Sequence, residues 1–109
     1  MIITGGENVY PSEVEEVVSS NACVFDCACI GVPDQKWGEK IVAVVTLKQG
    51  FSEEDVNEKE ISDCCREKLA GYKRPKQIVF IKSDEMPRTA TGKILHRKLR
   101  EKLATQSSG

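Results

Sequence analysis

A lysine that follows a glycine is the residue of this sequence best suited to chemistry. Lys93 ends the stretch Pro87-Arg88-Thr89-Ala90-Thr91-Gly92-Lys93, which is typical of a short, flexible loop. A mobile ammonium suits reactions of carboxylates and phosphates, because it binds their oxygens as a point charge. A solvated loop is the favoured interpretation while the stretch is taken alone, since lysines are mostly exposed.

The sequence lacks the residues that other nucleotide-binding and catalytic motifs require. A phosphate-binding loop needs a glycine where Pro87 stands and a serine or threonine where Ile94 stands. No G-x-G-x-x-G occurs, so a dinucleotide-binding fold has no support. The only histidine, His96, has no serine or cysteine partner that the sequence places near it, so a hydrolase triad is not supported either.

Two further clusters carry cations or an aromatic ring. The segment Tyr72-Lys73-Arg74-Pro75-Lys76 could bind phosphate, because arginine offers a planar fork of donors. Its alternative is a solvated connection with Tyr72 packed on the core. Trp37, the only tryptophan, could stack on a planar ring such as adenine. It could equally anchor its polar turn as a half-buried indole, and that interpretation is favoured without further context.

Length and charge limit the classes of protein. The chain has 109 residues, the size of one small domain, and its net charge of −1 gives no overall attraction for nucleic acid. Residues 53–67 are acidic and residues 88–102 are basic, a pattern typical of two solvated faces. No membrane span and no secretory signal is expected, so we expect a cytoplasmic protein.

The cysteines do not follow a metal-binding pattern. No C-x-x-C pair occurs among the five, and the single histidine completes no zinc-ligand spacing. Cys27 and Cys29 lie in an apolar run, while Cys64 and Cys65 lie on the apolar side of an expected helix. We therefore expect no metal site and buried, reduced thiols, which suit a reducing compartment.

Two helices have recognisable start signals. Pro11 opens the first, where Ser12 and Glu15 are spaced for a capping box. Asn57 and Glu60 are expected to cap the second.

Glycines and leucines predict the turns and the last helix. Gly5 and Gly6 favour a tight turn, because glycine adopts positive φ without steric cost. Gly71 is expected to end the second helix in the left-handed conformation. A last helix presents leucines at a spacing of four, namely Leu95, Leu99 and Leu103.

Three apolar runs, at residues 24–32, 41–47 and 77–81, predict strands. The resulting order of elements predicts an α+β domain in which helices pack on a small three-stranded sheet after an N-terminal β-turn. We expect this domain to span residues 1–103 and residues 104–109 to form a disordered tail.

Four motifs stand in an order that resembles the C-terminal domain of adenylate-forming enzymes. They are Gly5–Glu15, Ile30–Asp34 with Trp37–Glu39, Tyr72–Lys76 and Pro87–Lys93. Each motif is weak alone, but their order and spacing together are specific. Within that superfamily, the residues of these motifs resemble those of acyl- and aryl-CoA ligases, such as fatty acyl-CoA synthetases and 4-chlorobenzoate–CoA ligase. The resemblance covers nearly the whole chain and implies the mobile lid domain of such enzymes.

The resemblance implies a ligase that works in two half-reactions. A carboxylic acid first attacks the α-phosphate of ATP to give an acyl-adenylate and pyrophosphate. The C-terminal domain then rotates, and the thiol of CoA attacks the acyl-adenylate to give acyl-CoA. By the same resemblance, Lys93 is the catalytic lysine of adenylation, bridging carboxylate and phosphate oxygens.

The resemblance also implies a CoA-binding side of the domain. Gly5 and Gly6 would lie beside the pantetheine tunnel, where a backbone without side chains can approach a thin substrate arm. Trp37 would stack on or near the adenine of CoA. The nucleotide and its phosphates would be bound by Tyr72, Arg74 and Lys76.

The partners that the resemblance implies lie outside this chain. A large N-terminal domain would hold the ATP loop, the acyl pocket and the Mg²⁺ that accompanies ATP, so the isolated chain is expected to be inactive. A luciferase-like or acyl-AMP-forming enzyme is an alternative that would use Lys93 without CoA. A nucleic-acid-binding module using residues 88–102 is a remote alternative, and its affinity would fall steeply with salt.

Overall fold

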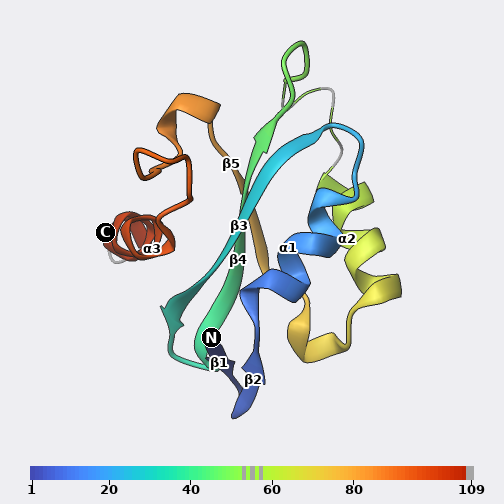
Figure 1. Ribbon diagram of the computed structural model, residues 1–109. Coiled ribbons are helices and arrows are strands. Elements are labelled where there is room, and N and C mark those ends of the chain that lie inside the picture. Colours follow the sequence, from blue (N-terminus) through green and yellow to red (C-terminus); the bar gives the residue numbers. More distant parts are fainter. Residues whose placement is uncertain (53, 55, 57, 108–109) are drawn as a thin grey trace.

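The computed structural model describes residues 1–52, 54, 56 and 58–107, and it confirms the expected α+β class (Figure 1). Its helices and strands follow one another as β1 (Ile2–Thr4), β2 (Glu7–Val9), α1 (Pro11–Ser19), β3 (Val24–Asp34), β4 (Gly38–Leu47), α2 (Glu58–Lys68), β5 (Gln77–Phe80) and α3 (His96–Ser107). Two single 3-10 turns, at Gly71–Lys73 and Ser83–Glu85, flank β5 in the chain.

The main sheet has the strand order β3-β4-β5, so β3 and β5 form its two edges. β3 and β4 pair antiparallel through a tight connection, whereas β4 and β5 pair parallel. A parallel pair requires a crossover, and the chain segment that contains α2 provides it. β1 and β2 form a separate antiparallel hairpin.

A bulge near the start of β3 reverses the alternation of its side chains. Val24 pairs with Leu47 and Asp26 pairs with Thr46, so Phe25 has no partner of its own on β4. A residue inserted in this way moves every following side chain to the opposite face. Val24 therefore lies on the α1 side of the sheet, and Asp26 lies on the α3 side.

Apolar side chains fill both faces of the sheet. α1 and α2 cover one face, and α3 covers the other (Figure 1). The core under α1 and α2 includes Val14, Val18, Cys27, Cys29, Ile41, Val45, Ile61 and Cys65. The core under α3 includes Ala28, Ile30, Val32, Val42, Val44, Met86 and Leu99. This double burial explains why β3 and β4 are apolar at nearly every position.

The expected capping box of α1 is wrong. The helix begins at Pro11, as predicted, but the residue before it makes no side-chain cap. Glu15 instead accepts a hydrogen bond from the backbone N–H of Cys29 at 2.7 Å. β3 is an edge strand, so an amide that points away from β4 needs such a partner.

The second helix also ends differently from the prediction. Gly71 is not left-handed; it opens a 3-10 turn after the helix has ended at Lys68. The carbonyls of this helix end are bound by the Arg74 side chain, which makes a left-handed glycine unnecessary. Asn57, the expected cap of α2, lies outside the described residues.

The last helix continues beyond residue 103 to Ser107, so its backbone includes part of the expected tail. The division of the chain at residue 103 stays a prediction. Leu99 is buried on the sheet and Leu103 packs beside it, as the leucine spacing predicted. Leu95 precedes the helix and accepts a hydrogen bond from the amide of Lys98 at 3.1 Å.

Among the described helices, none combines the length and apolarity needed to cross a membrane. The longest of them, α3, has 12 residues, whereas a span needs about 20.

Candidate functional site

Lys93 lies in a hydrogen-bonded turn rather than in a flexible loop. The Thr89 amide donates to the Lys93 carbonyl at 2.8 Å, and the Gly92 amide donates to the Thr89 carbonyl at 2.9 Å. The Thr89 hydroxyl also accepts from the Lys93 amide at 3.1 Å. Gly92 has a φ of +89°, which only glycine adopts without strain. The backbone of this lysine is therefore held in place.

The side chain of Lys93 is exposed, and among the described residues none forms an ion pair or hydrogen bond with its ammonium. Arg88, at the other end of the same turn, pairs instead with the Asp26 carboxylate. The two cations of this turn therefore differ, because one is fixed to the sheet and the other is free to bind an anion.

Trp37 lies at the turn between β3 and β4 and is fixed by its backbone. The carboxylate of Asp34 accepts the amides of Lys36 at 3.0 Å and Trp37 at 2.9 Å. The carbonyl of Trp37 accepts the Gly5 amide at 2.8 Å. The ammonium groups of Lys36 and Lys76 lie 4.9 and 5.1 Å from the centroid of the indole ring. Two cations and an aromatic ring suit a ligand with a planar base and phosphates.

The structure brings four of the predicted CoA-binding residues into one region. Gly5 approaches the indole so closely that a Cβ placed on it would lie 3.2 Å from Cε3 of Trp37. Gly6 completes the same turn, and Lys76 lies over the indole ring. Lys36 belongs to this region as well and was not predicted; its place next to Trp37 in a polar turn is the signal that could have identified it.

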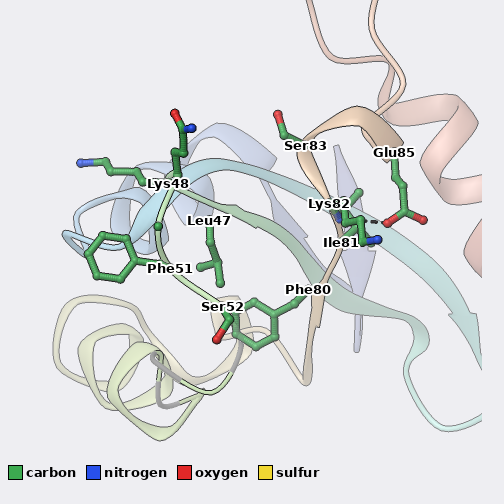
Figure 2. Close-up of a pocket in the computed structure, with 11 residues that line it drawn as sticks. Leu47, Lys48, Phe51, Ser52, Phe80, Ile81, Lys82, Ser83 and Glu85 are labelled. Atoms are coloured by element: carbon green, nitrogen blue, oxygen red, sulfur yellow. Dashed lines mark hydrogen bonds between the residues drawn. The ribbon is translucent and has the colours of Figure 1, made fainter.

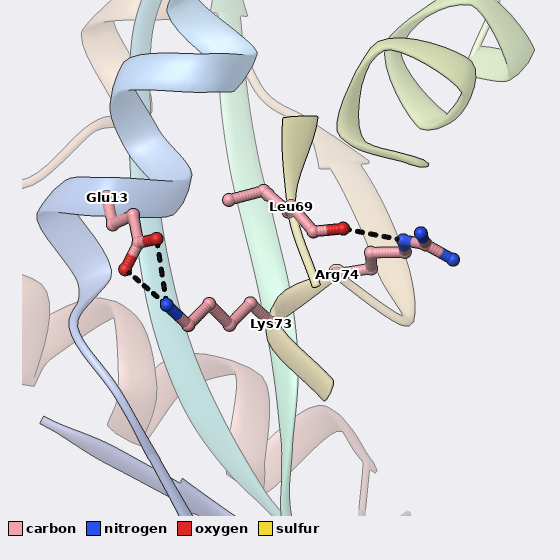
Figure 3. Close-up of polar contacts among 4 residues, drawn as sticks. All are labelled: Glu13, Leu69, Lys73 and Arg74. Atoms are coloured by element: carbon pink, nitrogen blue, oxygen red, sulfur yellow. Dashed lines mark hydrogen bonds and ion pairs between the residues drawn. The ribbon is translucent and has the colours of Figure 1, made fainter. Parts of the chain in front are cut away.

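The guanidinium of Arg74 is hydrogen-bonded to backbone carbonyls of the domain (Figure 3). Its Nε donates to the Leu69 carbonyl at 3.1 Å, and its Nη2 donates to the Arg66 carbonyl at 2.8 Å. Lys73, beside it, pairs with the Glu13 carboxylate at 2.9 Å, and this hydrogen bond raises the pKa of the lysine ammonium. Tyr72 is 43% exposed, so its ring remains available to a ligand.

Lys93 and Trp37 are held near opposite ends of β3. Arg88 fastens the lysine turn to Asp26 at the start of the strand, while Trp37 follows Asp34 at its end. A strand rises about 3.3 Å per residue, so these two attachment points lie roughly 25 Å apart. One small domain thus presents a free cation and an aromatic–cation cluster at separate places.

His96 closes the open edge of β3. Its Nε2 lies 2.6 Å from the Glu15 carboxylate that also binds the Cys29 amide. This contact joins the beginning of α3 to α1 around the edge of the sheet, so the histidine has a structural partner. Nothing in the sequence pattern pointed to it, because Glu15 and His96 lie 81 residues apart.

The thiols are free and the most deeply buried ones are inert. Burial raises the pKa of Cys27 and Cys29, and it also raises that of Cys65. Cys23 and Cys64 are half-buried. Within residues 1–52, 54, 56 and 58–107, no three histidine, cysteine or acidic side chains are grouped closely enough to hold a metal ion.

A pocket of about 470 Å³ opens beyond the ends of the parallel strands β4 and β5 (Figure 2). Leu47 and Phe80 lie along it, with Phe51 at its rim. It contains none of the predicted site residues.

Comparison with known proteins identifies the family. Residues 13–93 match the family model of the AMP-binding enzyme C-terminal domain. The chain is 46% identical over 101 residues to a long-chain-fatty-acid–CoA ligase of Mycobacterium tuberculosis. The aligned region covers 93% of this chain and 19% of that protein. The chain is 43% identical over 102 residues to a 2-succinylbenzoate–CoA ligase of Listeria monocytogenes, covering 94% of this chain and 20% of the ligase.

Solved structures agree. The Mycobacterium tuberculosis fatty acyl CoA synthetase is similar with a TM-score of 0.86 and 44% identity, covering 97% of this chain and 20% of that one. An anthranilate CoA ligase in complex with anthranoyl-AMP gives a TM-score of 0.84 at 41% identity, covering 96% of this chain and 20% of that one. The chain thus spans about a fifth of the length of the relatives it matches. By fold, motif order and similarity over most of its length, this chain belongs to the family of AMP-binding enzyme C-terminal domains.

Proposed function

We propose that this chain acts as the mobile C-terminal domain of an ATP-dependent acid–thiol ligase, which makes acyl-CoA through an acyl-adenylate. Its partners are an adenylation domain, a carboxylic acid, ATP and CoA. Mg²⁺ accompanies ATP on the adenylation domain in this proposal.

Lys93 serves the first half-reaction. A carboxylate oxygen of the acid forms a bond to the α-phosphorus, the bond from that phosphorus to the bridging oxygen breaks, and pyrophosphate leaves. Negative charge lies on both reacting groups, so their approach requires a cation between them. The free ammonium of Lys93, on a backbone held by Thr89, is suited to that position.

The other end of the domain serves the second half-reaction. The CoA thiolate attacks the carbonyl carbon of the acyl-adenylate, and AMP leaves with the bonding electrons. Gly5 and Gly6 let the backbone lie against the pantetheine arm, and Trp37 stacks on the adenine. The nucleotide is further bound by Tyr72, Arg74 and Lys76. Arg74 acts through the nitrogen that the carbonyls of Arg66 and Leu69 leave free, since these bind two of its three nitrogens.

The separation of Lys93 and Trp37 along β3 is the observation that carries this proposal. A domain that served one reaction would have its cation and its aromatic platform side by side. Two separate clusters suit a domain that presents one end during adenylation and the other during thioester formation. The exchange between them is a rotation of the whole domain against its partner.

The test uses a polypeptide that joins this chain to an adenylation domain. We expect Lys93→Ala to slow acyl-adenylate formation by about 100-fold or more, because it removes a donor to the charge that develops in the transition state. Thioester formation from preformed acyl-adenylate should persist. ATP–pyrophosphate exchange measures the first step, and release of acyl-CoA from the added adenylate measures the second.

The exposed lysine of α3, Lys98, provides the matched control, since Lys98→Ala removes an equal charge nearby. Equal losses in both half-reactions after Lys93→Ala would contradict the assigned role. Adenylate formation without any reaction with CoA would favour the luciferase-like or acyl-AMP-forming alternative, which shares the lysine but not the thiol acceptor.

A further inference from the structure

The bulge in β3 determines which face of the sheet carries Asp26. Before the bulge, Val24 packs in the core under α1 and α2; after it, Cys27 and Cys29 pack there. Even-numbered residues after the bulge, such as Ala28, pack under α3. If residues 24–26 alternated regularly without the bulge, Asp26 would lie on the same side as Val24 and would face α1 instead. The irregularity thus directs one carboxylate toward the side on which the Lys93 turn lies.

The backbone at the bulge is stabilised by a buried hydroxyl. A bulge leaves an amide out of the regular ladder, and such a group must find another partner when it is buried. Thr46 Oγ1 accepts the Asp26 amide at 3.1 Å, and Thr46 is completely buried. Valine occupies the preceding positions of β4, so a threonine here has a specific task.

The Asp26 carboxylate, on β3, binds the lysine turn through Arg88. It pairs with the Arg88 guanidinium, and both side chains are about three-quarters buried. Arg88 bridges to Ile94 across the turn, directly beside the backbone bonds between Thr89 and Lys93. The turn is therefore rigid within itself and is fastened to the sheet by this ion pair.

We propose that Asp26 and Arg88 are positioning residues that set where Lys93 stands for the adenylation step. This inference rests on the proposed function of Lys93. Neither residue needs to touch the substrate: the ion pair orients the turn, and the turn presents the ammonium. A free lysine on a rigid but unanchored turn would reach the reacting oxygens with a scatter of orientations.

The test is Asp26→Asn in the polypeptide joined to an adenylation domain. The substitution keeps the shape of the side chain and removes its charge, so Arg88 loses its ionic partner. We expect ATP–pyrophosphate exchange to fall by about 10- to 100-fold in kcat, as expected when a reacting group is misplaced by about 1 Å. Thioester formation from preformed acyl-adenylate should stay unchanged, because it uses the other end of the domain.

Glu13→Gln is the matched control, since it breaks another partly buried ion pair of the domain, that with Lys73. It should lower stability to a similar degree without a selective loss of adenylation. Arg88→Ala should reproduce the effect of Asp26→Asn, and the double variant should lose no more than either single variant. Additive losses would mean that the two residues act separately and would overturn the inference.

The outcomes separate this inference from the function it rests on. If Lys93→Ala leaves adenylation intact, the proposed function fails. If Lys93→Ala abolishes adenylation while Asp26→Asn has no effect, or slows both half-reactions equally, the lysine is catalytic and the positioning role is wrong. Selective loss in both variants supports the two together.

Discussion

Two lysine ammonium groups lie close to the indole ring of Trp37. An indole that is 38% exposed would ordinarily be an attractive surface for any apolar partner. The ammonium groups of Lys36 and Lys76, each about 5 Å from the ring, attract an anionic ligand to the same place. Under the proposed function, this arrangement would favour a base that carries phosphates over an apolar group alone.

We expect Trp37→Ala to raise the KM for CoA in the joined polypeptide by about tenfold to a hundredfold, because stacking contributes about 1–3 kcal/mol per base. ATP–pyrophosphate exchange should not change. Trp37→Phe should retain part of the affinity, and Phe51→Ala serves as a control at another exposed aromatic residue. An unchanged KM would show that the indole is only an anchor of the turn.

Residue types could be predicted better than residue contacts. The glycine before Lys93 predicts a loop, and the structure places Lys93 on an exposed turn. The resemblance implies that Arg74 contacts the CoA nucleotide and its phosphates, and the structure shows that two backbone carbonyls also bind its guanidinium. Those acceptors belong to the end of a helix whose position relative to Arg74 depends on the whole connection, so local sequence carries no signal for them.

At the scale of elements, the turn of the β1–β2 hairpin lies against the tryptophan. Gly5 and Gly6 have φ values of +56° and +82°, as a two-residue turn between twisted strands requires. The two glycines differ in their surroundings, because only Gly5 faces Trp37. Substituting either glycine should strain the backbone to a similar degree, but only a substitution of Gly5 should disturb the contact with Trp37.

We expect Gly5→Ala and Gly6→Ala each to destabilise the domain by roughly 1–2 kcal/mol, the cost of a left-handed residue with a side chain. Urea unfolding measures that loss. Only Gly5→Ala should also shift the fluorescence of the single tryptophan, since its methyl group would press on the indole. Identical fluorescence in both variants would contradict a tight fit of Gly5 against the ring.

Elements were predictable where burial alone decides them. The three apolar runs predict all three strands of the main sheet, and Pro11 predicts the start of α1. Helix ends were less predictable, because side chains such as Glu15 can bind distant groups instead of their own helix. The bulge at Phe25 also has no signature in its residue types; it depends on the pairing with β4.

At the scale of the molecule, one sheet separates two cores. β3 and β4 contribute side chains to both, so neither core can be lost without loosening the other. The face under α3 is the smaller of the two, and the buried Leu99 is the main side chain that this helix places there. Docking of α3 in turn supports the lysine turn that precedes it.

Leu99→Ala should therefore lower the free energy of unfolding by about 2–5 kcal/mol, the usual cost of a large cavity in a core. Leu103→Ala, one turn further and only partly buried, should cost less. Urea unfolding followed by tryptophan fluorescence and by circular dichroism should give one shared transition for each variant. Two separated transitions would show that the cores unfold independently.

The ion pair between Asp26 and Arg88 joins residues that lie 62 positions apart. Closing so long a segment costs conformational entropy that a single ion pair does not offset, so the pair persists only after the sheet and α3 have formed. A chain that is still folding therefore has Lys93 but no fixed place for it. Under the proposed function, completion of folding and readiness for acid activation would be the same event, so a misfolded copy would be chemically silent instead of wasteful of ATP.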